Sequence, residues 1–211
     1  MRTRVKICGI TRLDDALAAA EAGADAVGFV FWPRSPRCVP VDVAARIRRA
    51  LPAFVVPVGV FVNQGIDQVA AIADTVGLGA VQLHGDEPPA QWAAVPAPCI
   101  KAVAVSDGFD PRVLAAWPEA VLPLLDVYDP ERRGGTGRAV DRSAAAEAAR
   151  IRPVVLAGGL RAENVEAAIL DIRPYAVDVS SGVERAPGVK DLGRLRAFLQ
   201  AVCRADARKE S

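Results

Sequence analysis

Several kinds of residue and segment are scarce in this sequence. It has one histidine and four cysteines, at positions 8, 38, 99 and 203, whose spacing matches neither paired zinc ligands nor the dense framework of a small secreted domain. No apolar stretch approaches the ~20 residues of a membrane span, and the N-terminus has no apolar segment followed by a cleavage site. We therefore expect a cytoplasmic protein that uses no metal and does not associate with membranes.

A strong charge of one sign is also missing. The formal net charge is +1, and no run of Lys and Arg interleaves with aromatic residues, which argues against a nucleic-acid surface. The short basic segment Arg204–Lys209 contains Asp206 and is followed by Glu210, and we expect it to be a frayed, solvated C-terminus.

Two kinds of segment alternate along the chain. Short, β-branched apolar runs are expected as strands at Val5–Cys8, Ala26–Phe31, Val55–Val62, Ala80–His84, Ile100–Val105, Val121–Asp126, Pro153–Ala157 and Tyr175–Val179. Ala-rich stretches with helical spacing lie between them, including Leu13–Ala22, Val43–Leu51, Ile66–Val76, Val113–Trp117, Ser143–Ile151, Val165–Ile172 and Leu192–Val202. This alternation predicts a parallel sheet with helices outside it.

The number of expected strands predicts how the sheet closes. About eight strands, roughly 20 to 30 residues apart, indicate an α/β fold that closes into a single (β/α)₈ TIM barrel. With 211 residues the chain is short for this fold, so we expect one domain over residues 1–211 with few insertions. A doubly wound open sheet is the main alternative, but its Gly-x-Gly-x-x-Gly turn after the first strand is missing.

One connection is long for so short a chain. It runs from Val127 to about Arg142 and contains Gly134-Gly135-Thr136-Gly137. Glycine clusters in long loops often mark binding segments, but a flexible surface loop fits the composition equally well.

The first strand ends in a candidate catalytic residue. Strand alternation places Lys6 and Cys8 on the barrel interior, and active sites of such barrels lie at the C-terminal strand ends. An ammonium near a thiol favours the thiolate, which can act as a base or nucleophile. Taken alone, however, the pair is more typical of a small buried Cys beside a structural Lys.

The sixth strand ends in a carboxylate. Asp126 closes a strongly apolar run, so it lies either at the barrel mouth or in a turn or helix cap. At the mouth, the pKa of a carboxyl group can rise to suit general acid catalysis.

Small residues follow the seventh and eighth expected strands. These are Gly158-Gly159 and Ser180-Ser181-Gly182. Phosphate sites in these barrels are commonly built from the loops after strands 7 and 8 and the start of a short extra helix. We therefore predict a phosphate site there, with ordinary turn glycines as the alternative.

Two further polar residues follow strands. Arg37 lies in a proline-stiffened loop after the second strand, where a guanidinium could bind a carboxylate in bidentate fashion or remain a solvated surface group. His84, the only histidine, is expected to point inward with Gln82. A lone histidine cannot hold a metal, and a hydrogen-bonded position in the core or at the rim is favoured over a catalytic one.

A series of motifs runs in order along nearly the whole chain. It comprises Lys6–Thr11, Gly28–Phe31, Ser35–Arg37, Gly59–Asn63, Gln82–Glu87, Leu125-Asp126, Gly134–Gly137, Leu156–Leu160, Asn164-Val165, Asp178–Glu184, Pro187-Gly188 and Lys190-Asp191. Together these motifs resemble those of the phosphoribosylanthranilate isomerase family. One departure is Val140-Asp141-Arg142, where the family usually has Phe-Asp-Trp.

The resemblance implies an activity. It is the Amadori rearrangement of N-(5-phosphoribosyl)anthranilate to 1-(2-carboxyphenylamino)-1-deoxyribulose 5-phosphate in tryptophan biosynthesis, with no metal or cofactor. It also implies roles: Cys8 as general base, Asp126 as general acid and Arg37 at the anthranilate carboxylate. The backbones around Gly158-Gly159 and Ser180-Ser181 match the phosphate site, and His84 and Asp178 fall near the substrate.

Two other classes of function stay open. A Schiff-base lyase needs a reactive lysine at the mouth, and the inward candidates Lys6 and Lys101 do not close their strands. A metal epimerase would need several histidine and carboxylate ligands. A non-catalytic phosphate binder would have lost its acid or base, whereas Cys8 and Asp126 are both present. The sequence leaves both a monomer and a homodimer open.

Overall fold

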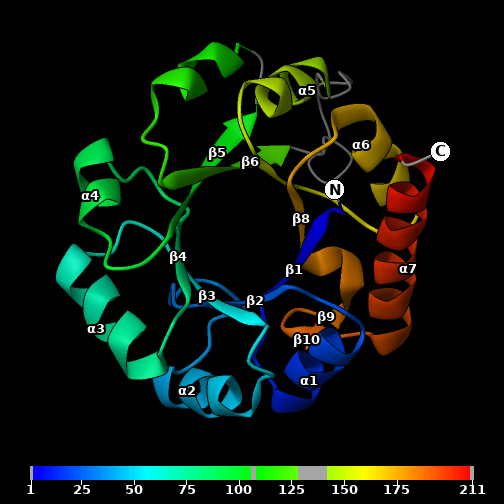
Figure 1. The fold of residues 1–211 in the computed structure, drawn as a ribbon. Helices are drawn as coiled ribbons and strands as arrows, with labels where there is room; N and C mark the ends of the chain where they lie inside the picture. Colours follow the sequence, from blue (N-terminus) through cyan, green and yellow to red (C-terminus); the bar gives the residue numbers. More distant parts are fainter. Residues whose placement is uncertain (1, 106–107, 128–141, 210–211) are drawn as a thin grey trace.

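Eight parallel strands close into a barrel, and helices surround it (Figure 1). The computed structural model describes residues 2–105, 108–127 and 142–209. The strands are hydrogen-bonded in the order of the sequence, and β1 completes the circle by pairing with both β2 and β8. The predicted (β/α)₈ barrel is therefore confirmed.

The elements follow the predicted alternation closely. The barrel strands are β1 (Arg4–Cys8), β2 (Ala26–Val30), β3 (Val56–Phe61), β4 (Ala80–Leu83), β5 (Cys99–Val105), β6 (Val121–Val127), β7 (Val155–Ala157) and β8 (Ala176–Val179). The helices are α1 (Leu13–Glu21), α2 (Val41–Ala50), α3 (Ile66–Val76), α4 (Pro89–Ala94), α5 (Arg142–Ile151), α6 (Val165–Ile172) and α7 (Leu192–Lys209).

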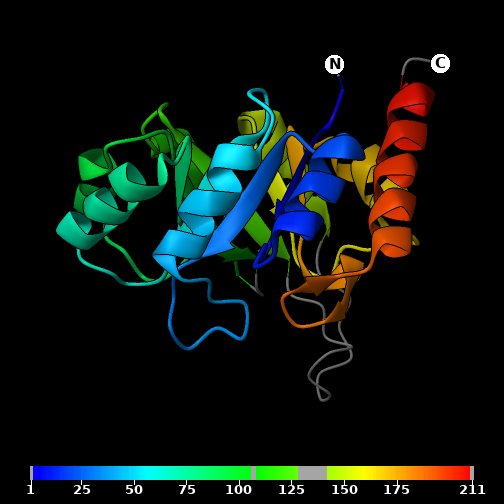
Figure 2. The same cartoon turned by 90° about the horizontal axis from the view of Figure 1, so that it is seen from below.

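Between β8 and α7 the chain forms additional short elements. These are the 3₁₀ helix η3 (Ser181–Val183) and an antiparallel hairpin of β9 (Glu184–Ala186) and β10 (Val189–Lys190). Figure 2 shows this hairpin and the loop after β2 at the end of the barrel opposite the two chain termini. That end is where the parallel strands finish, and it is the end at which a barrel active site is expected.

The alternation along β1 separates the hydrophobic core from the site. Val5 and Ile7 are buried in the large apolar cluster between the barrel and its helices. Lys6 and Cys8 point the other way, as predicted, and Cys8 packs inside the barrel with Val30 and Val60. The period-2 pattern of one strand thus places a cation and a thiol inside the barrel.

One expected helix has a different geometry. The segment predicted at Val113–Trp117 forms the 3₁₀ helix η1 (Pro111–Ala116). The guanidinium of Arg152 holds the end of this region, because it donates hydrogen bonds to five carbonyl oxygens, those of Leu114, Trp117, Pro118, Glu119 and Val121. These carbonyl oxygens need hydrogen-bond donors, and an arginine more than 30 residues away in the sequence supplies them.

The prediction of a frayed basic C-terminus is wrong. Residues 204–209 are the last turns of α7, and Ala205 is fully buried. The carboxylate of Asp206 accepts hydrogen bonds of 2.7 Å from both the backbone N–H and the Oγ1 of Thr3. The local composition suggested a solvated tail, but a buried helix face and this link to the first strand hold the segment in place.

Within the described residues, no helix combines the length and the apolar character needed to cross a membrane. The glycine cluster, for which the composition left a binding segment and a flexible surface loop equally open, lies outside the described residues together with Val140 and Asp141.

Candidate active site

A cavity of about 460 Å³ lies at the C-terminal ends of the strands. All nine residues predicted as site residues line it: Cys8, Arg37, His84, Asp126, Gly158, Gly159, Asp178, Ser180 and Ser181. They come from six different strand ends, so the closure of the barrel brings them together. Trp32, Ser35 and Gln82 also line it, and none of these three was predicted as a site residue.

Lys6 and Asp178 form an ion pair at the base of this cavity. Nζ of Lys6 lies 2.9 Å from Oδ1 of Asp178, and both side chains are almost completely buried. Lys6 also lies beside the thiol of Cys8, because a Cβ on Gly28 would be 2.9 Å from Cys8 Sγ and 3.1 Å from Lys6 Nζ. Glycine at position 28 on β2 therefore leaves the space that the ammonium and the thiol occupy.

The environment of Cys8 sets its protonation. Burial is the largest influence and raises the pKa of the Cys8 thiol; the Lys6 ammonium opposes it, and the net shift is upward. Although burial lowers the pKa of Lys6, the Asp178 carboxylate and Cys8 outweigh it, so Lys6 stays protonated. The predicted effect of the ammonium on the thiol is present, but the effect of desolvation on the pKa is larger.

Asp126 faces the same cavity from β6. Its side chain is 44% exposed, and its Oδ2 lies 3.6 Å from Nε2 of His84. The other ring nitrogen of His84, Nδ1, lies 2.8 Å from the side-chain amide of Gln82. The prediction that Gln82 and His84 point inward together is confirmed, and the pair brings the imidazole toward the carboxylate.

The loops after β7 and β8 touch each other. A Cβ on Gly182 would lie 1.9 Å from the carbonyl oxygen of Leu160, so only glycine permits this approach. Gly158 and Gly159 both have positive φ, 88° and 60°, a backbone conformation that glycine adopts at little cost. Ser181 opens η3 directly after these loops. Two loops and a short helix thus meet at the cavity, which is the arrangement on which the prediction of a phosphate site rests.

Comparison with known proteins identifies the family. Residues 5–201 match the family model for N-(5'phosphoribosyl)anthranilate (PRA) isomerase. The chain belongs to this family. An N-(5'-phosphoribosyl)anthranilate isomerase of Geobacter sp. (strain M21) is 50% identical over 211 residues, covering 99% of this chain and 100% of the relative.

Solved structures of the isomerase family have the same fold. The phosphoribosyl anthranilate isomerase of Thermotoga maritima superposes with a TM-score of 0.86 at 45% identity, over 95% of this chain and 98% of that one. A second structure is that of an isomerase in complex with reduced 1-(o-carboxyphenylamino)-1-deoxyribulose 5-phosphate; its TM-score is 0.84 at 43% identity, again over 95% and 98% of the two chains.

Both lysines considered for a Schiff-base lyase are held in ion pairs in this isomerase. Lys6 binds Asp178, and Nζ of Lys101 lies 2.7 Å from Oε2 of the fully buried Glu87. Burial would raise the pKa of Glu87, but hydrogen bonds from Lys101 and from backbone groups lower it overall. Neither lysine presents a free amine to the cavity, which agrees with the isomerase assignment.

Two residues next to the cavity were not predicted as site residues. Glu184 and Lys190 lie on the β9–β10 hairpin, and Glu184 forms an ion pair of 2.7 Å with Arg37. They belong to the quoted motifs, but spacing alone did not reveal that the hairpin folds back onto the β2–α2 loop. Arg37 is therefore not a fully solvated surface group, because one edge of its guanidinium is paired with a protein carboxylate.

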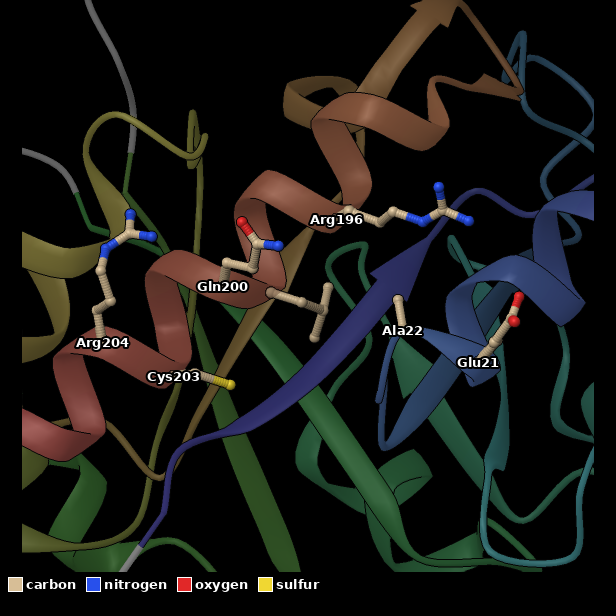
Figure 3. Close-up of a pocket in the computed structure, with 7 residues that line it drawn as sticks. Glu21, Ala22, Arg196, Gln200, Cys203 and Arg204 are labelled. Carbon is tan, nitrogen blue, oxygen red and sulfur yellow. The ribbon is translucent and has the colours of Figure 1, made fainter.

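A separate hollow lies on the outside of the barrel (Figure 3). It has a volume of about 590 Å³ between α1 and α7, where Glu21 faces Arg196, and the exposed Cys203 lies on its α7 side. None of the nine predicted site residues lines it. The chemistry predicted from the sequence is thus confined to the barrel mouth.

Proposed function

We propose that this chain converts N-(5-phosphoribosyl)anthranilate to 1-(2-carboxyphenylamino)-1-deoxyribulose 5-phosphate, with Cys8 as general base and Asp126 as general acid. The observation that carries the proposal is that both side chains line one cavity together with the loops after β7 and β8. Family membership supports the reaction, and the geometry supports the assignment of its residues.

The reaction begins with opening of the ribose ring. Protonated Asp126 donates a proton to the furanose oxygen, the C1′–O bond breaks, and the nitrogen lone pair forms an iminium with C1′. His84, 3.6 Å from Asp126, then faces the carboxylate that has lost its proton. A positioned side chain that transfers a proton in this way contributes about 10²–10⁴-fold to the rate.

The second step moves a proton from carbon. The thiolate of Cys8 removes the C2′ proton, and the C–H electrons form the C1′=C2′ bond while the iminium electrons return to nitrogen. The resulting enolamine tautomerises to the ketone product. The substrate's own iminium accepts the electrons, so the chemistry needs no cofactor, and Lys6 beside the thiol stabilises the thiolate.

The two ends of the substrate are held by different groups. We assign the phosphate to the backbones around Gly158-Gly159 and Ser180-Ser181, and the anthranilate carboxylate to Arg37. The complex of a related isomerase with a reduced product analogue supports occupation of this cavity by a molecule that carries both groups. Anchoring at both ends orients the reacting carbon between acid and base.

Two buried oxygens support a polar ligand in the cavity. Among the described residues, Oε1 of Gln82 and Oγ of Ser180 have no hydrogen-bond partner. Buried polar groups in folded proteins are almost always hydrogen-bonded. Since both residues line the cavity, substrate hydroxyl and phosphate groups complete their hydrogen bonding in this proposal.

The proposal extends to the setting of the enzyme. We place it in the cytoplasm as one barrel domain over residues 1–211, as a monomer or homodimer. Its four cysteines are free thiols in the structure, which suits a reducing compartment.

The test is loss of the substrate's fluorescence on mixing with purified protein in the presence of EDTA. We expect rapid turnover by the wild type and a loss of about 10²–10⁴-fold in kcat for Asp126→Asn. Glu119→Gln, a substitution of an exposed carboxylate outside the cavity, is the control and should retain full activity. Lack of turnover by folded wild type would overturn the assignment.

A further inference from the structure

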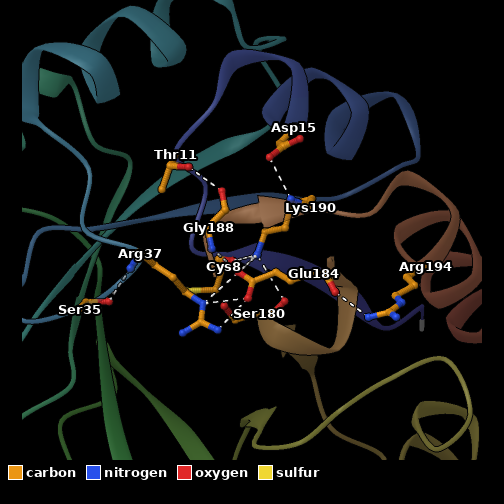
Figure 4. Close-up of polar contacts among 10 residues, drawn as sticks. All are labelled: Cys8, Thr11, Asp15, Ser35, Arg37, Ser180, Glu184, Gly188, Lys190 and Arg194. Carbon is orange, nitrogen blue, oxygen red and sulfur yellow. Dashed lines mark hydrogen bonds and ion pairs between the residues drawn. The ribbon is translucent and has the colours of Figure 1, made fainter. Parts of the chain in front are cut away.

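Arg37 is held by a carboxylate that is buried more deeply than the arginine itself. Its Nε lies 2.9 and 3.1 Å from the two carboxylate oxygens of Glu184, and its Nη2 lies 2.7 Å from Oε2 (Figure 4). The Glu184 side chain is 4% exposed, whereas that of Arg37 is 25% exposed and lines the cavity. The pair therefore uses one edge of the guanidinium and leaves the Nη1 group outside these bonds.

The carboxylate of Glu184 is itself fixed from several directions. Its Oε1 also accepts a hydrogen bond of 2.9 Å from Nζ of Lys190 and one of 3.3 Å from the backbone N–H of Gly188. Its own carbonyl oxygen accepts a 2.6 Å bond from Arg194. Because both oxygens and the backbone are bound, the carboxylate cannot rotate without breaking charge-assisted bonds.

Lys190 connects this pair to the catalytic base. Its fully buried ammonium also donates to the carbonyl oxygen of Cys8, and to that of Ser180 at 3.3 Å (Figure 4). Burial would raise the pKa of Glu184, but hydrogen bonds from Arg37 and Lys190 lower it overall, so the carboxylate is ionised. The Glu184 carboxylate thus contacts both the guanidinium of Arg37 and the amino group of Lys190 beside the cavity.

The side chain of Arg37 also packs closely against the backbone of Gly9. A Cβ on Gly9 would lie 2.7 Å from Arg37 Cδ and 3.0 Å from Ser180 Oγ. Gly9 has a φ of 75°, so its backbone conformation and the space above it both favour glycine. The arginine thus reaches Glu184 by passing directly over the backbone that follows Cys8.

From these contacts we propose that Glu184 is a positioning residue for the isomerisation: it orients the Arg37 guanidinium so that the edge left free binds the substrate's aromatic carboxylate. The inference rests on the proposed function, because it assigns Arg37 to that carboxylate. A glutamine at position 184 could accept only through its single oxygen, and its NH₂ group would face a cation. The guanidinium of Arg37 would then lose the carboxylate whose two oxygens fix its orientation.

The experiment compares two substrates, N-(5-phosphoribosyl)anthranilate and N-(5-phosphoribosyl)aniline, which differ only in the carboxylate. The ratio of their kcat/KM values measures carboxylate recognition. We expect Glu184→Gln to lower this ratio about tenfold, chiefly through KM for the anthranilate, because a lost charge-assisted contact typically has this size. We expect Arg37→Ala to lower it at least as much, and the double variant to lose nothing further.

The matched control is Glu166→Gln, which removes a carboxylate paired with Arg204 and Arg208 on the outer helices and should leave the ratio unchanged. If Glu184→Gln does not fold, Glu184→Asp keeps the charge on a shorter side chain and should lower the ratio by a smaller factor. Equal losses for both substrates, or an unchanged ratio, would overturn the role of Glu184 while leaving the activity intact. Inactive wild type would instead overturn the proposed function itself.

Discussion

The ammonium of Lys6 lies 2.9 Å from the carboxylate of Asp178 at the base of the cavity, next to the thiol of Cys8. The two charges act on the thiol in opposite directions, because the cation lowers the pKa of Cys8 and the anion raises it. Burial adds the largest upward effect. The ion pair therefore tunes the base in the proposed reaction.

Removing either charge should move the pH profile in a predictable direction. The rate rises with pH as the Cys8 thiol loses its proton, and this limb of kcat/KM reports the free enzyme. Lys6→Met removes the cation that lowers the pKa of Cys8, so the rising limb should move to higher pH. Asp178→Asn removes the anion that raises this pKa, so the rising limb should move to lower pH.

The control for this pair is Arg46→Met, which removes an exposed cation on α2 and should leave the limb in place. Lys6→Met and Asp178→Asn each leave one buried charge without its partner, which costs about 3–5 kcal/mol of folding stability. Thermal unfolding therefore checks first that both variants are folded. Shifts in the same direction for both variants would contradict the account.

Gly28→Ala should damage catalysis more than folding. The added Cβ would lie 2.9 Å from Cys8 Sγ and 3.1 Å from Lys6 Nζ, so the thiol must move. A displacement of the base by a fraction of an ångström should lower kcat about 10- to 100-fold. Gly65→Ala is the matched control, since a Cβ there meets nothing within 4 Å. In steady-state kinetics this control should keep the wild-type kcat, whereas Gly28→Ala should lose it.

Gly182→Ala should weaken phosphate binding. Its Cβ would lie 1.9 Å from the Leu160 carbonyl oxygen, so the loops after β7 and β8 must separate. We expect KM for the substrate and the inhibition constant of inorganic phosphate to rise together, by about tenfold, as the loss of about 1.4 kcal/mol implies. Unchanged inhibition by phosphate would show that these loops do not form the phosphate site.

Asp206→Asn should destabilise the protein in a pH-dependent way. Burial would raise the pKa of Asp206, but hydrogen bonds from Thr3 and Lys209 lower it overall. A carboxylate with a depressed folded-state pKa contributes stability above its unfolded pKa of about 3.9, and this is lost as pH falls through the folded value. Denaturant unfolding should therefore show a loss of about 1–3 kcal/mol at pH 7.

The difference between wild type and Asp206→Asn should shrink as the pH falls from the unfolded pKa of about 3.9 to the lower folded pKa, where the folded carboxylate also gains its proton. Equal differences at pH 7 and in acid would indicate that the lost interaction does not depend on the charge of Asp206. Activity at neutral pH should be retained, because this link joins Thr3 to α7, away from the cavity.

The barrel and its mouth were predictable because they follow from short-range periodicity. Alternation along Val5–Cys8 separates interior from exterior side chains, and parallel strands bring their C-terminal ends to one rim. Cys8 and Asp126 are far apart in the chain, yet this rule alone places both in the cavity.

Other features depended on tertiary contacts that no local pattern contains. Arg37 and Glu184 are 147 positions apart, and they meet only because the β9–β10 hairpin folds back over the site. The upward shift of the Cys8 pKa depends on burial, whereas the sequence showed only the neighbouring Lys6. The C-terminal turns of α7 were misjudged because their ordering depends on Thr3 at the other end of the chain.

The most direct test of the account is the rate of Cys8→Ala on phosphoribosylanthranilate, with Cys203→Ala as the matched control at an exposed thiol. The account predicts that Cys8→Ala loses about 10²–10⁴-fold in kcat while it still binds the reduced product analogue, and that Cys203→Ala is fully active. A Cys8→Ala enzyme that turns over at the wild-type rate would contradict the assignment of Cys8 as the base.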